Sequence, residues 1–425
     1  MKKLFKIIGI IIVAVGIAIA VYYNAKNESL PIGKKGTEAD ALAHKMLKAL
    51  NFEAYQQTEF IEWSFRGKHS YKWDKENNIV TVTWNNVKAI LHTKSPEKNE
   101  LFVDGEVSQN KKLIQNAIDY FNNDSFWLVA PYKVFDNGVE RRLVNHEDKD
   151  ALLVTYTTGG STPGDSYLWI LDENGMPTSF KMWVDVIPIG GASATWSDWV
   201  TTESGIKLPS KHKLSIASIA LEMGTVKATN PKANALANNL LKAIKHEAYK
   251  HTRYITWSFA GRRSYKWDKT KHIIEVVWGK NKVVLHPNNM DKSTLFVDGK
   301  EQTENKKELV QKALRYFNND SFWLVAPHKL FETGIIRSIE KHNDKNSLKV
   351  KYTTGGTTPG DSYLWLLDEN FLPIKYKMYI PSMKMDGVEA TWEDWITTES
   401  GTLLPKTHYS ASGRKLSMGD VKGYN

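Results

Sequence analysis

A glycine-rich segment that ends in an acid is the first place where residue types and spacing suggest chemistry. It reads TTGGSTPGD at 157–165 and TTGGTTPGD at 353–361. Glycines can cradle a phosphate when a helix begins behind them, but here the strand-like SYLW follows. We therefore predict a hairpin loop with glycine at positive φ, and a binding or active-site loop is the alternative. The candidate loop residues are Thr162, Pro163, Gly164, Asp165, Thr358, Pro359, Gly360 and Asp361.

Two further acids, Asp124 and Asp320, lie in a shared sequence, NNDSFW. An acid beside a suitable base could take part in general acid–base catalysis. The interpretation we favour is that the acid or the following serine caps a short turn, while Phe126 and Trp127 enter the core.

The sequence shows no catalytic triad, no paired carboxylates and no G-x-S-x-G elbow. The histidines that recur are His92 with His286 and His212 with His408, and their spacing gives no HxxxH or HxH ligand pair. We interpret them as ordinary strand residues. The sequence therefore predicts a protein that is not an enzyme and has no metal and no cofactor.

Tryptophan is in surplus, with 15 residues in a chain of 425. Each indole taken alone is a core residue, but as a set they could line a wide apolar cavity. Stacking on nucleic-acid bases would call for interleaved Lys and Arg clusters, and sugar binding for exposed tryptophan platforms; spacing alone excludes neither, and we predict no nucleic-acid partner. The candidate lining residues are Trp63, Trp73, Trp84, Trp127, Trp169, Trp257, Trp267, Trp278, Trp323 and Trp365.

These residues recur because the body of the chain is one module written twice. The tripeptide at 63–65, WSF, returns 194 residues later at 257–259. After two single-residue insertions, YFNNDSFWLVAP at 120–131 returns unchanged at 316–327. A period this long is a whole domain and not a solenoid repeat. We predict a leader and tether over 1–36, a first domain over 37–229 and a second over 230–425.

The elements that must position the candidates follow one order in each copy. In the first copy an apolar stripe predicts a helix over 41–50, and strand-like runs follow at 61–65, 70–73, 79–84, 88–92 and 101–103. A second helix is predicted over 110–121. Strands return at 152–157, 166–171, 179–186, 194–201 and 211–219. This order predicts an α+β domain dominated by antiparallel sheet.

Composition sets wider limits. The apolar fraction of 41% and the aromatic fraction of 11% exclude disorder for most of the chain. The absence of cysteine excludes disulfides, cysteine-ligated metals and a lipid-modified N-terminal cysteine. The net charge of +10 is spread along the chain, so it indicates little about partners.

The N-terminus has the pattern of a membrane or export segment. Lysines precede an uncharged run from Ile7 to Tyr23, which would span about 25 Å as a helix. We expect a single-pass inner-membrane anchor with the C-terminal body in the periplasm. The alternative is a cleaved signal peptide, with Ala18-Ile19-Ala20 as the cleavage site and a secreted periplasmic product. Residues 24–36 are polar and predict a tether.

The helix start, the aromatic strands, the phrase NDSFWLVAP with Lys133 after it, and TPGDSYLW together form a distinctive pattern. This pattern resembles exported proteins of the LolA/LolB-like lipoprotein-carrier superfamily, most closely uncharacterised Bacteroidota members. The resemblance covers about 38–228 and 232–425. It implies an incomplete antiparallel β-barrel with a helical lid, whose hollow holds acyl chains, and it supplies no catalytic residues. The duplication and the tether depart from the single-domain soluble carriers.

Three functions remain open. The first is a membrane-tethered extracytoplasmic protein that binds lipids, lipoprotein acyl chains or other amphiphiles in a half-barrel. The second is a structural or protein-interaction module of the cell envelope, for which paired domains offer avidity. The third is a hydrolase that uses Asp165 and Asp361, or Asp124 and Asp320, which would need polar groups converging in a cleft.

Overall fold

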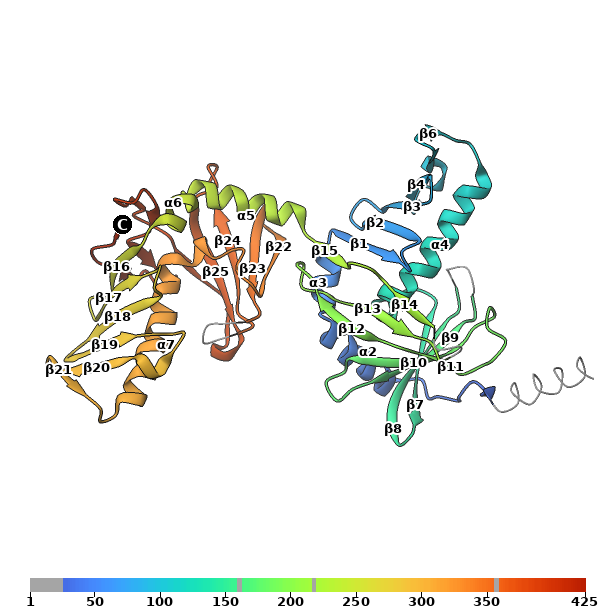
Figure 1. Cartoon of the computed structure of the whole chain (residues 1–425), viewed down its shortest axis with the longest axis horizontal. Helices are drawn as coiled ribbons and strands as arrows, with labels where there is room; N and C mark the ends of the chain where they lie inside the picture. The colour runs from blue at the N-terminus through green and yellow to red at the C-terminus, as the bar shows by residue number, and fades with distance from the viewer. Residues whose placement is uncertain (1–25, 159–162, 216–218, 355–358) are drawn as a thin grey trace, which may run out of the picture. The chain divides into compact units, whose positions relative to one another are not determined.

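The computed structural model describes residues 26–158, 163–215, 219–354 and 359–425. It divides into two compact units, Met1–Thr229 and Asn230–Asn425. Each unit is α+β and contains several curved antiparallel sheets together with a few helices (Figure 1). The units are called unit 1 and unit 2 below.

Unit 1 begins with two helices, continues with strands and a long helix, and ends with more strands. Its elements are α2 (Thr37–Leu50), α3 (Phe52–Gln57), β1 (Phe60–Phe65), β2 (His69–Asp74), β3 (Ile79–Trp84), β4 (Val87–His92), η1 (Pro96–Lys98), β5 (Glu100–Val103), β6 (Glu106–Val107), α4 (Lys111–Val129), η2 (Ala130–Lys133), β7 (Val139–His146), β8 (Lys149–Tyr156), β9 (Ser166–Leu171), β10 (Pro177–Trp183), β11 (Ala192–Thr195), β12 (Ser197–Thr201), β13 (Lys207–Lys213), β14 (Ala220–Glu222) and β15 (Lys227–Thr229).

Unit 2 follows the same order. Its elements are α5 (Pro231–Ala243), α6 (His246–His251), β16 (Tyr254–Phe259), β17 (Arg263–Asp268), β18 (Ile273–Trp278), β19 (Asn281–Leu285), η3 (Met290–Lys292), β20 (Thr294–Val297), β21 (Lys300–Gln302), α7 (Lys306–Val325), η4 (Ala326–His328), β22 (Ile335–His342), β23 (Lys345–Tyr352), β24 (Ser362–Leu367), β25 (Pro373–Ile380), η5 (Pro381–Met383), β26 (Met385–Thr391), β27 (Ile396–Thr397), β28 (Leu403–Leu404), β29 (Thr407–Tyr409), β30 (Lys415–Ser417) and β31 (Lys422–Tyr424).

The sheets of unit 1 join into one open series. A seven-stranded sheet has the order β15-β1-β2-β3-β4-β5-β6, and a five-stranded sheet has the order β11-β10-β9-β8-β7. The short sheet β12-β13-β14 links them, because Ala194 bridges to Leu214 and the Ser64 amide donates to the Met223 carbonyl (3.0 Å). Every pairing is antiparallel. β6 and β7 lie at its two ends, so the described strands do not close into a barrel.

Unit 2 repeats this arrangement. Its seven-stranded sheet runs β21-β20-β19-β18-β17-β16-β31, and its five-stranded sheet runs β22-β23-β24-β25-β26. The bridge from Ala390 to Ser410 and the hydrogen bond from the Ser258 amide to the Met418 carbonyl (3.0 Å) match the links in unit 1. The two units therefore place corresponding side chains in corresponding positions of the same sheets.

Helix α4 packs against β4 and β5 of the seven-stranded sheet, and its rings contact β9 and β10 of the five-stranded sheet; α7 contacts β19, β20, β24 and β25 in the same way (Figure 1). The Asn110 side chain caps the start of α4 by accepting from the Lys112 and Leu113 amides at 3.1 and 3.3 Å. The sequence predicts this helix only over 110–121, and the structure extends it to Val129. The turn predicted for NNDSFW is therefore wrong: Asp124 lies inside the helix and does not cap a turn.

Residues 26–36, which precede α2, run along the outer face of the five-stranded sheet of unit 1. The Lys34 and Leu143 backbones exchange two hydrogen bonds (2.9 and 2.8 Å), and the Trp183 indole donates to the Glu28 carbonyl (2.8 Å). Beneath the segment lies a small buried cluster made of Val144, Ala151, Leu153, Leu168 and, partly buried, Trp183. The sequence predicts a polar tether here, and the described residues 26–36 run along the unit instead.

One prediction of cellular location needs correction. Across the described ranges, none of the helices has both the length and the apolar character needed to cross a membrane. The segment from Ile7 to Tyr23, on which the single-pass inner-membrane location was based, lies outside the described residues. We therefore do not retain the inner-membrane anchor.

Candidate functional site

The five candidate tryptophans of unit 1 gather at one helix. Trp127 is part of α4, and the other four lie on strands β1, β2, β3 and β9. Phe121 of α4 contacts Trp63 and Trp73, with ring centroids 6.3 and 5.4 Å apart. The other two contacts are Trp84 with Tyr120 at 5.5 Å and Trp169 with Phe126 at 6.3 Å.

Unit 2 reproduces three of these four contacts around α7. Phe317 contacts Trp257 at 6.3 Å and Trp267 at 5.3 Å, and Tyr316 contacts Trp278 at 5.7 Å. Trp323 belongs to α7, and Tyr376 lies 5.8 Å from it and 5.7 Å from Trp365. Strand positions far apart in sequence meet one helix because the strands alternate and the sheet curves.

The indoles differ in how they satisfy their N–H groups. Trp199 and Trp183 donate to the carbonyls of Pro177 (3.1 Å) and Glu28 (2.8 Å). Among the described residues, several buried candidate indoles have no such acceptor, and an unpaired buried donor is costly. These are Trp63, Trp169, Trp257, Trp267 and Trp365. The interface between helix and sheet thus combines aromatic surface with unused donors, which suits an apolar ligand carrying a few acceptor atoms.

A buried acid fastens each long helix to the sheet. Asp124 of α4 accepts from the Tyr71 hydroxyl (2.5 Å) and from Nδ1 of His69 (2.7 Å). In unit 2 the acid Asp320 accepts from the Tyr265 hydroxyl and from two nitrogens of Arg263, at 2.6 and 3.1 Å. Burial and the adjacent carboxylate raise the pKa of both tyrosines above the usual range. Because these partners lie on β2 and β17, each acid ties its long helix to the seven-stranded sheet of its unit.

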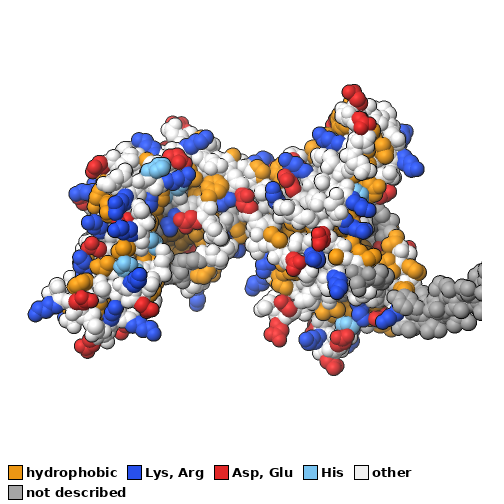
Figure 2. All heavy atoms as spheres, viewed as in Figure 1, with side chains coloured by type: hydrophobic (Ala, Val, Ile, Leu, Met, Phe, Trp, Pro, Cys, Tyr) orange, Lys and Arg blue, Asp and Glu red, His pale blue; other side chains and the backbone are white. Residues whose placement is uncertain are grey.

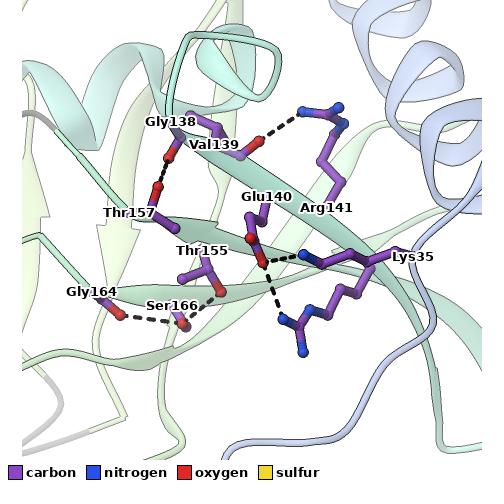
Figure 3. Close-up of polar contacts among 10 residues, drawn as sticks. Lys35, Gly138, Val139, Glu140, Arg141, Thr155, Thr157, Gly164 and Ser166 are labelled. Atoms are coloured by element: carbon purple, nitrogen blue, oxygen red, sulfur yellow. Dashed lines mark hydrogen bonds and ion pairs between the residues drawn. The ribbon is translucent and has the colours of Figure 1, made fainter.

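The predicted hairpin loop joins β8 to β9, as the motif indicated. Gly164 has a φ of 108°, and its amide donates to the Tyr156 carbonyl (2.7 Å). Figure 3 shows the neighbouring contacts, in which Ser166 Oγ lies 2.9 Å from Thr155 Oγ1 and Thr157 donates to the Gly138 carbonyl. Thr162 and Thr358 lie outside the described residues.

The acids of these loops serve local structure. Asp165 is 7% exposed, and its Oδ1 accepts from the Asp185 amide (3.2 Å). Asp361 is 4% exposed, and its side chain hydrogen-bonds to Tyr363. Gly360 repeats the positive φ, at 104°. A buried carboxylate engaged in this way is poorly placed to attack or protonate a substrate.

The recurring histidines fall into two kinds. His92 ends β4 and His286 follows β19, at the sheet margin. His212 and His408 are fully buried, and their Nδ1 atoms lie 2.8 and 2.7 Å from the Thr195 and Thr391 carbonyls. Burial lowers the pKa of each to about 4, so both are neutral at pH 7. Within the described ranges, no three His, Asp or Glu side chains form a metal-binding group.

Sequence reasoning missed several polar groups. Lys75 and Lys269 donate to the Tyr55 and Tyr249 carbonyls and lie 3.6 Å from those rings. Burial first, and the charge of a second lysine next, lower the pKa of each to about 8. Both follow the repeated SYKWD, so the repeat itself carried the signal. The repeat gives no such signal for His69 and Arg263, because the two copies carry different residues at that position.

On the viewed faces of both units, Lys and Arg side chains are interspersed with Asp and Glu side chains (Figure 2). This matches a positive charge that is spread along the sequence. A mixed surface favours solubility over strong electrostatic recognition.

Comparisons with known proteins add two structural neighbours. A DUF1329 family protein from Desulfovibrio piger is 12% identical, with a TM-score of 0.27, and the match covers 45% of this chain and 91% of that one. A putative outer membrane lipoprotein-sorting protein domain from Vibrio parahaemolyticus is 10% identical, with a TM-score of 0.17, and covers 67% and 83%. At these TM-scores neither neighbour assigns a fold or a function. No family model and no curated protein matches the chain.

Proposed function

We propose that each unit is a non-enzymatic binding module for the acyl chain of a lipid, a lipoprotein or another amphiphile. The acyl chain of the ligand would lie between the long helix (α4 or α7) and the aromatic inner face of the curved sheet. The observation that carries this proposal is that five tryptophans per unit, far apart in sequence, lie on or near that one helix.

The chemistry of this interface supports an apolar ligand. Indole and phenyl rings offer large apolar area at a small entropic cost. Trp73 and Trp127 are only partly buried, and both pack against the core of unit 1. A helix that moved away from the sheet would uncover a continuous ring surface that an acyl chain could cover in its place. The resemblance to lipoprotein carriers implies the same use of the space between sheet and lid.

The hydrolase alternative has less support. Asp124 accepts from a tyrosine and an imidazole, Asp320 accepts from a tyrosine and a guanidinium, and Asp165 and Asp361 are buried in hairpin loops. The interaction-module alternative would rely on exposed apolar residues such as Ile32, Val107 and Val186. These belong to different segments, so they do not define a docking face.

Quenching of tryptophan fluorescence by brominated stearic acid and by a brominated dipalmitoyl lipopeptide would test the proposal in the full chain. Because bromine quenches only indoles close to it, we expect strong, saturable quenching. Trp84→Phe and Trp278→Phe, which keep a ring in each unit, should lower the quenchable fraction. The matched control is Trp183→Phe, since Trp183 lies on the outer face of unit 1 and its loss should leave that fraction unchanged.

Native mass spectrometry of the purified full chain provides a second readout. One or two co-purifying lipids per chain would support binding in one or both units. An apo mass, together with no quenching by either probe below its micelle concentration, would overturn the proposal. The interaction module would then be the function to test.

A further inference from the structure

A cluster of three neighbouring rings occurs at corresponding places in both units, but two of its rings differ. In unit 1, Tyr55 lies 6.1 Å from Phe52 and 4.2 Å from Tyr132. In unit 2, Tyr249 lies 5.7 Å from His246 and 4.1 Å from His328, and the two imidazoles are themselves neighbours, with centroids 5.5 Å apart. Both units therefore place flat rings at these positions, and unit 2 supplies two of them as imidazoles.

Nε2 of His328 binds the same backbone carbonyl position that the Tyr132 hydroxyl binds in unit 1. The Tyr132 hydroxyl donates to the Lys207 carbonyl (2.6 Å). The corresponding contact in unit 2 joins His328 Nε2 to the Leu403 carbonyl (3.1 Å). Because a carbonyl only accepts, Nε2 carries the hydrogen, and Nδ1 keeps its lone pair. Nδ1 is therefore not needed for the contact with the Leu403 carbonyl.

Nδ1 of His328 faces another imidazole. His328 Nδ1 and His246 Nδ1 lie 3.2 Å apart. Two nitrogens bound to one tetrahedral zinc ion, each 2.0–2.1 Å from it, lie roughly 3.3 Å apart. An imidazole whose other nitrogen donates to a backbone carbonyl is the usual state of a metal-ligating histidine, because that bond fixes the tautomer and the ring orientation.

We propose that unit 2 binds one divalent transition-metal ion through Nδ1 of His246 and Nδ1 of His328, and that unit 1 does not. Imidazole ligands favour Zn²⁺, Ni²⁺ and Cu²⁺, with Cu²⁺ the tightest. Within the described ranges no third acid or imidazole completes the set, so water fills the remaining positions. His246 is only partly buried, which leaves a route for the ion and its waters.

The charges around the pair are mixed. The cations of Lys250 and Lys269 act on His246. Glu247, paired with Lys250 at 2.8 Å, partly offsets their positive charge. His328 is 4% exposed, and its Nε2 is bound to the Leu403 carbonyl, so Nδ1 is the nitrogen that keeps a lone pair.

Metal binding to the full chain, measured by calorimetry and by equilibrium dialysis with elemental analysis, tests the proposal with Cu²⁺, Ni²⁺ and Zn²⁺ chlorides. We expect one tight equivalent with the affinity order Cu²⁺ over Ni²⁺ and Zn²⁺. His246→Phe and His328→Tyr install the unit 1 residues, and each should weaken binding at least about tenfold. The control His251→Ala changes an exposed histidine of the same helix and should leave binding unchanged.

A gain-of-site variant keeps the test independent of any misfolding in unit 2. Phe52→His with Tyr132→His should add a second equivalent, in unit 1. The copper EPR spectrum of the wild-type chain should show nitrogen hyperfine structure that His328→Tyr removes. No binding at millimolar metal would show that the imidazoles form a hydrogen-bonded pair only and would overturn the proposal. Equal binding by wild type and His328→Tyr would overturn it as well.

Discussion

The outer faces of the two five-stranded sheets carry different side chains on the same backbone. In unit 1 the face is apolar, with Val144, Ala151 and Leu153 buried beneath residues 26–36. The corresponding positions in unit 2 are Glu340, Ser347 and Lys349. There Lys349 and Glu340 form an ion pair (2.7 Å) and Lys349 lies 5.5 Å from the Tyr379 ring.

The difference follows from what precedes the first helix of each unit along the chain. In unit 1, residues before α2 cover the outer face. The residues just before α5 of unit 2 are already committed, because β15 pairs with β1 of unit 1. An uncovered sheet face must be polar to stay in water, so the second copy carries charges there. The inner faces, which hold the tryptophan clusters, are alike because each faces the corresponding long helix, α4 in unit 1 and α7 in unit 2.

Deleting residues 26–35 should have the largest effect. It removes the cover from the apolar outer face of unit 1, so we expect a loss of several kcal/mol in unit 1, together with self-association. Hydrogen-exchange mass spectrometry on the full chain should show faster exchange in β7 to β10 and no change in β22 to β26.

A polar outer face provides the matched control for that deletion. The triple change Val144→Glu, Ala151→Ser and Leu153→Lys gives unit 1 the residues of unit 2. In this background the deletion should cost much less and the chain should stay monomeric. If the deletion alone leaves exchange in β7 to β10 unchanged, the segment is not a structural cover and the comparison fails.

Replacing the buried acids should lower the free energy of unfolding of the two units by different amounts, and the effect should be smaller than that of the deletion. Asp320→Asn leaves the Arg263 guanidinium beside an uncharged group in unit 2, and we expect a loss of about 3–5 kcal/mol. Asp124→Asn should cost only about 1–2 kcal/mol, because it leaves no guanidinium without a partner and the new amide oxygen still accepts from Tyr71. Urea unfolding followed by hydrogen exchange in peptides of β2 and β17 measures both.

Exchanging the partner sharpens this test. Arg263→His in the Asp320→Asn background removes the unpaired guanidinium and should recover much of the loss. Equal costs for Asp124→Asn and Asp320→Asn would mean that the partner residue does not matter.

Local patterning predicted much of the fold, and non-local polar contacts explain where it failed. The apolar stripes and the alternating strands gave the antiparallel α+β class. Strand β7 was missed because Glu140, Arg141 and Arg142 suggest a solvated segment. In the structure Arg141 donates to the Asp40 carboxylate (2.7 Å) and to the Val134 carbonyl (2.7 Å), and neither acceptor is adjacent in sequence. Figure 3 shows Glu140 held in a similar way by Lys35.

In the candidate site, too, local sequence patterns identified some residues, while contacts between distant residues decided where they lie. Repetition singled out the tryptophans, but only the sheet topology shows that they meet one helix. Asp124 was misplaced because its partners, Tyr71 and His69, lie on a strand some fifty residues earlier. The repeat gives no signal for His246 and His328, because the first copy has Phe52 and Tyr132 at the corresponding positions.

Acidification should affect both units through a group that they share. His212 and His408 have pKa values of about 4 in the folded chain, against 6.5 for an ordinary histidine. The folded state therefore binds fewer protons, so the stabilisation is complete above pH 6.5 and is lost as the pH falls toward 4. The loss is roughly 3 kcal/mol per histidine.

Glutamine variants isolate this contribution. His212→Gln and His408→Gln keep a donor for the Thr195 and Thr391 carbonyls but cannot titrate. Each should flatten the dependence of unfolding free energy on pH between 6.5 and 4 by a similar amount, as measured by urea titration at several pH values. A change in only one of them would show that the two interiors differ more than their matching contacts indicate.

The smallest effect should come from an ion pair that one unit lacks. Arg141 pairs with Asp40, while Arg337 donates to the neutral Asn234 amide oxygen (2.8 Å). Asp40 is 45% exposed, so solvent screens the pair, and Asp40→Asn should cost at most about 1 kcal/mol in unit 1. Asn234→Asp should stabilise unit 2 by no more than that, since Arg337 already donates to the Leu330 carbonyl (2.7 Å). Urea unfolding at low and high salt measures both, and a loss above 2 kcal/mol for Asp40→Asn would mean that the aspartate does more than pair with Arg141.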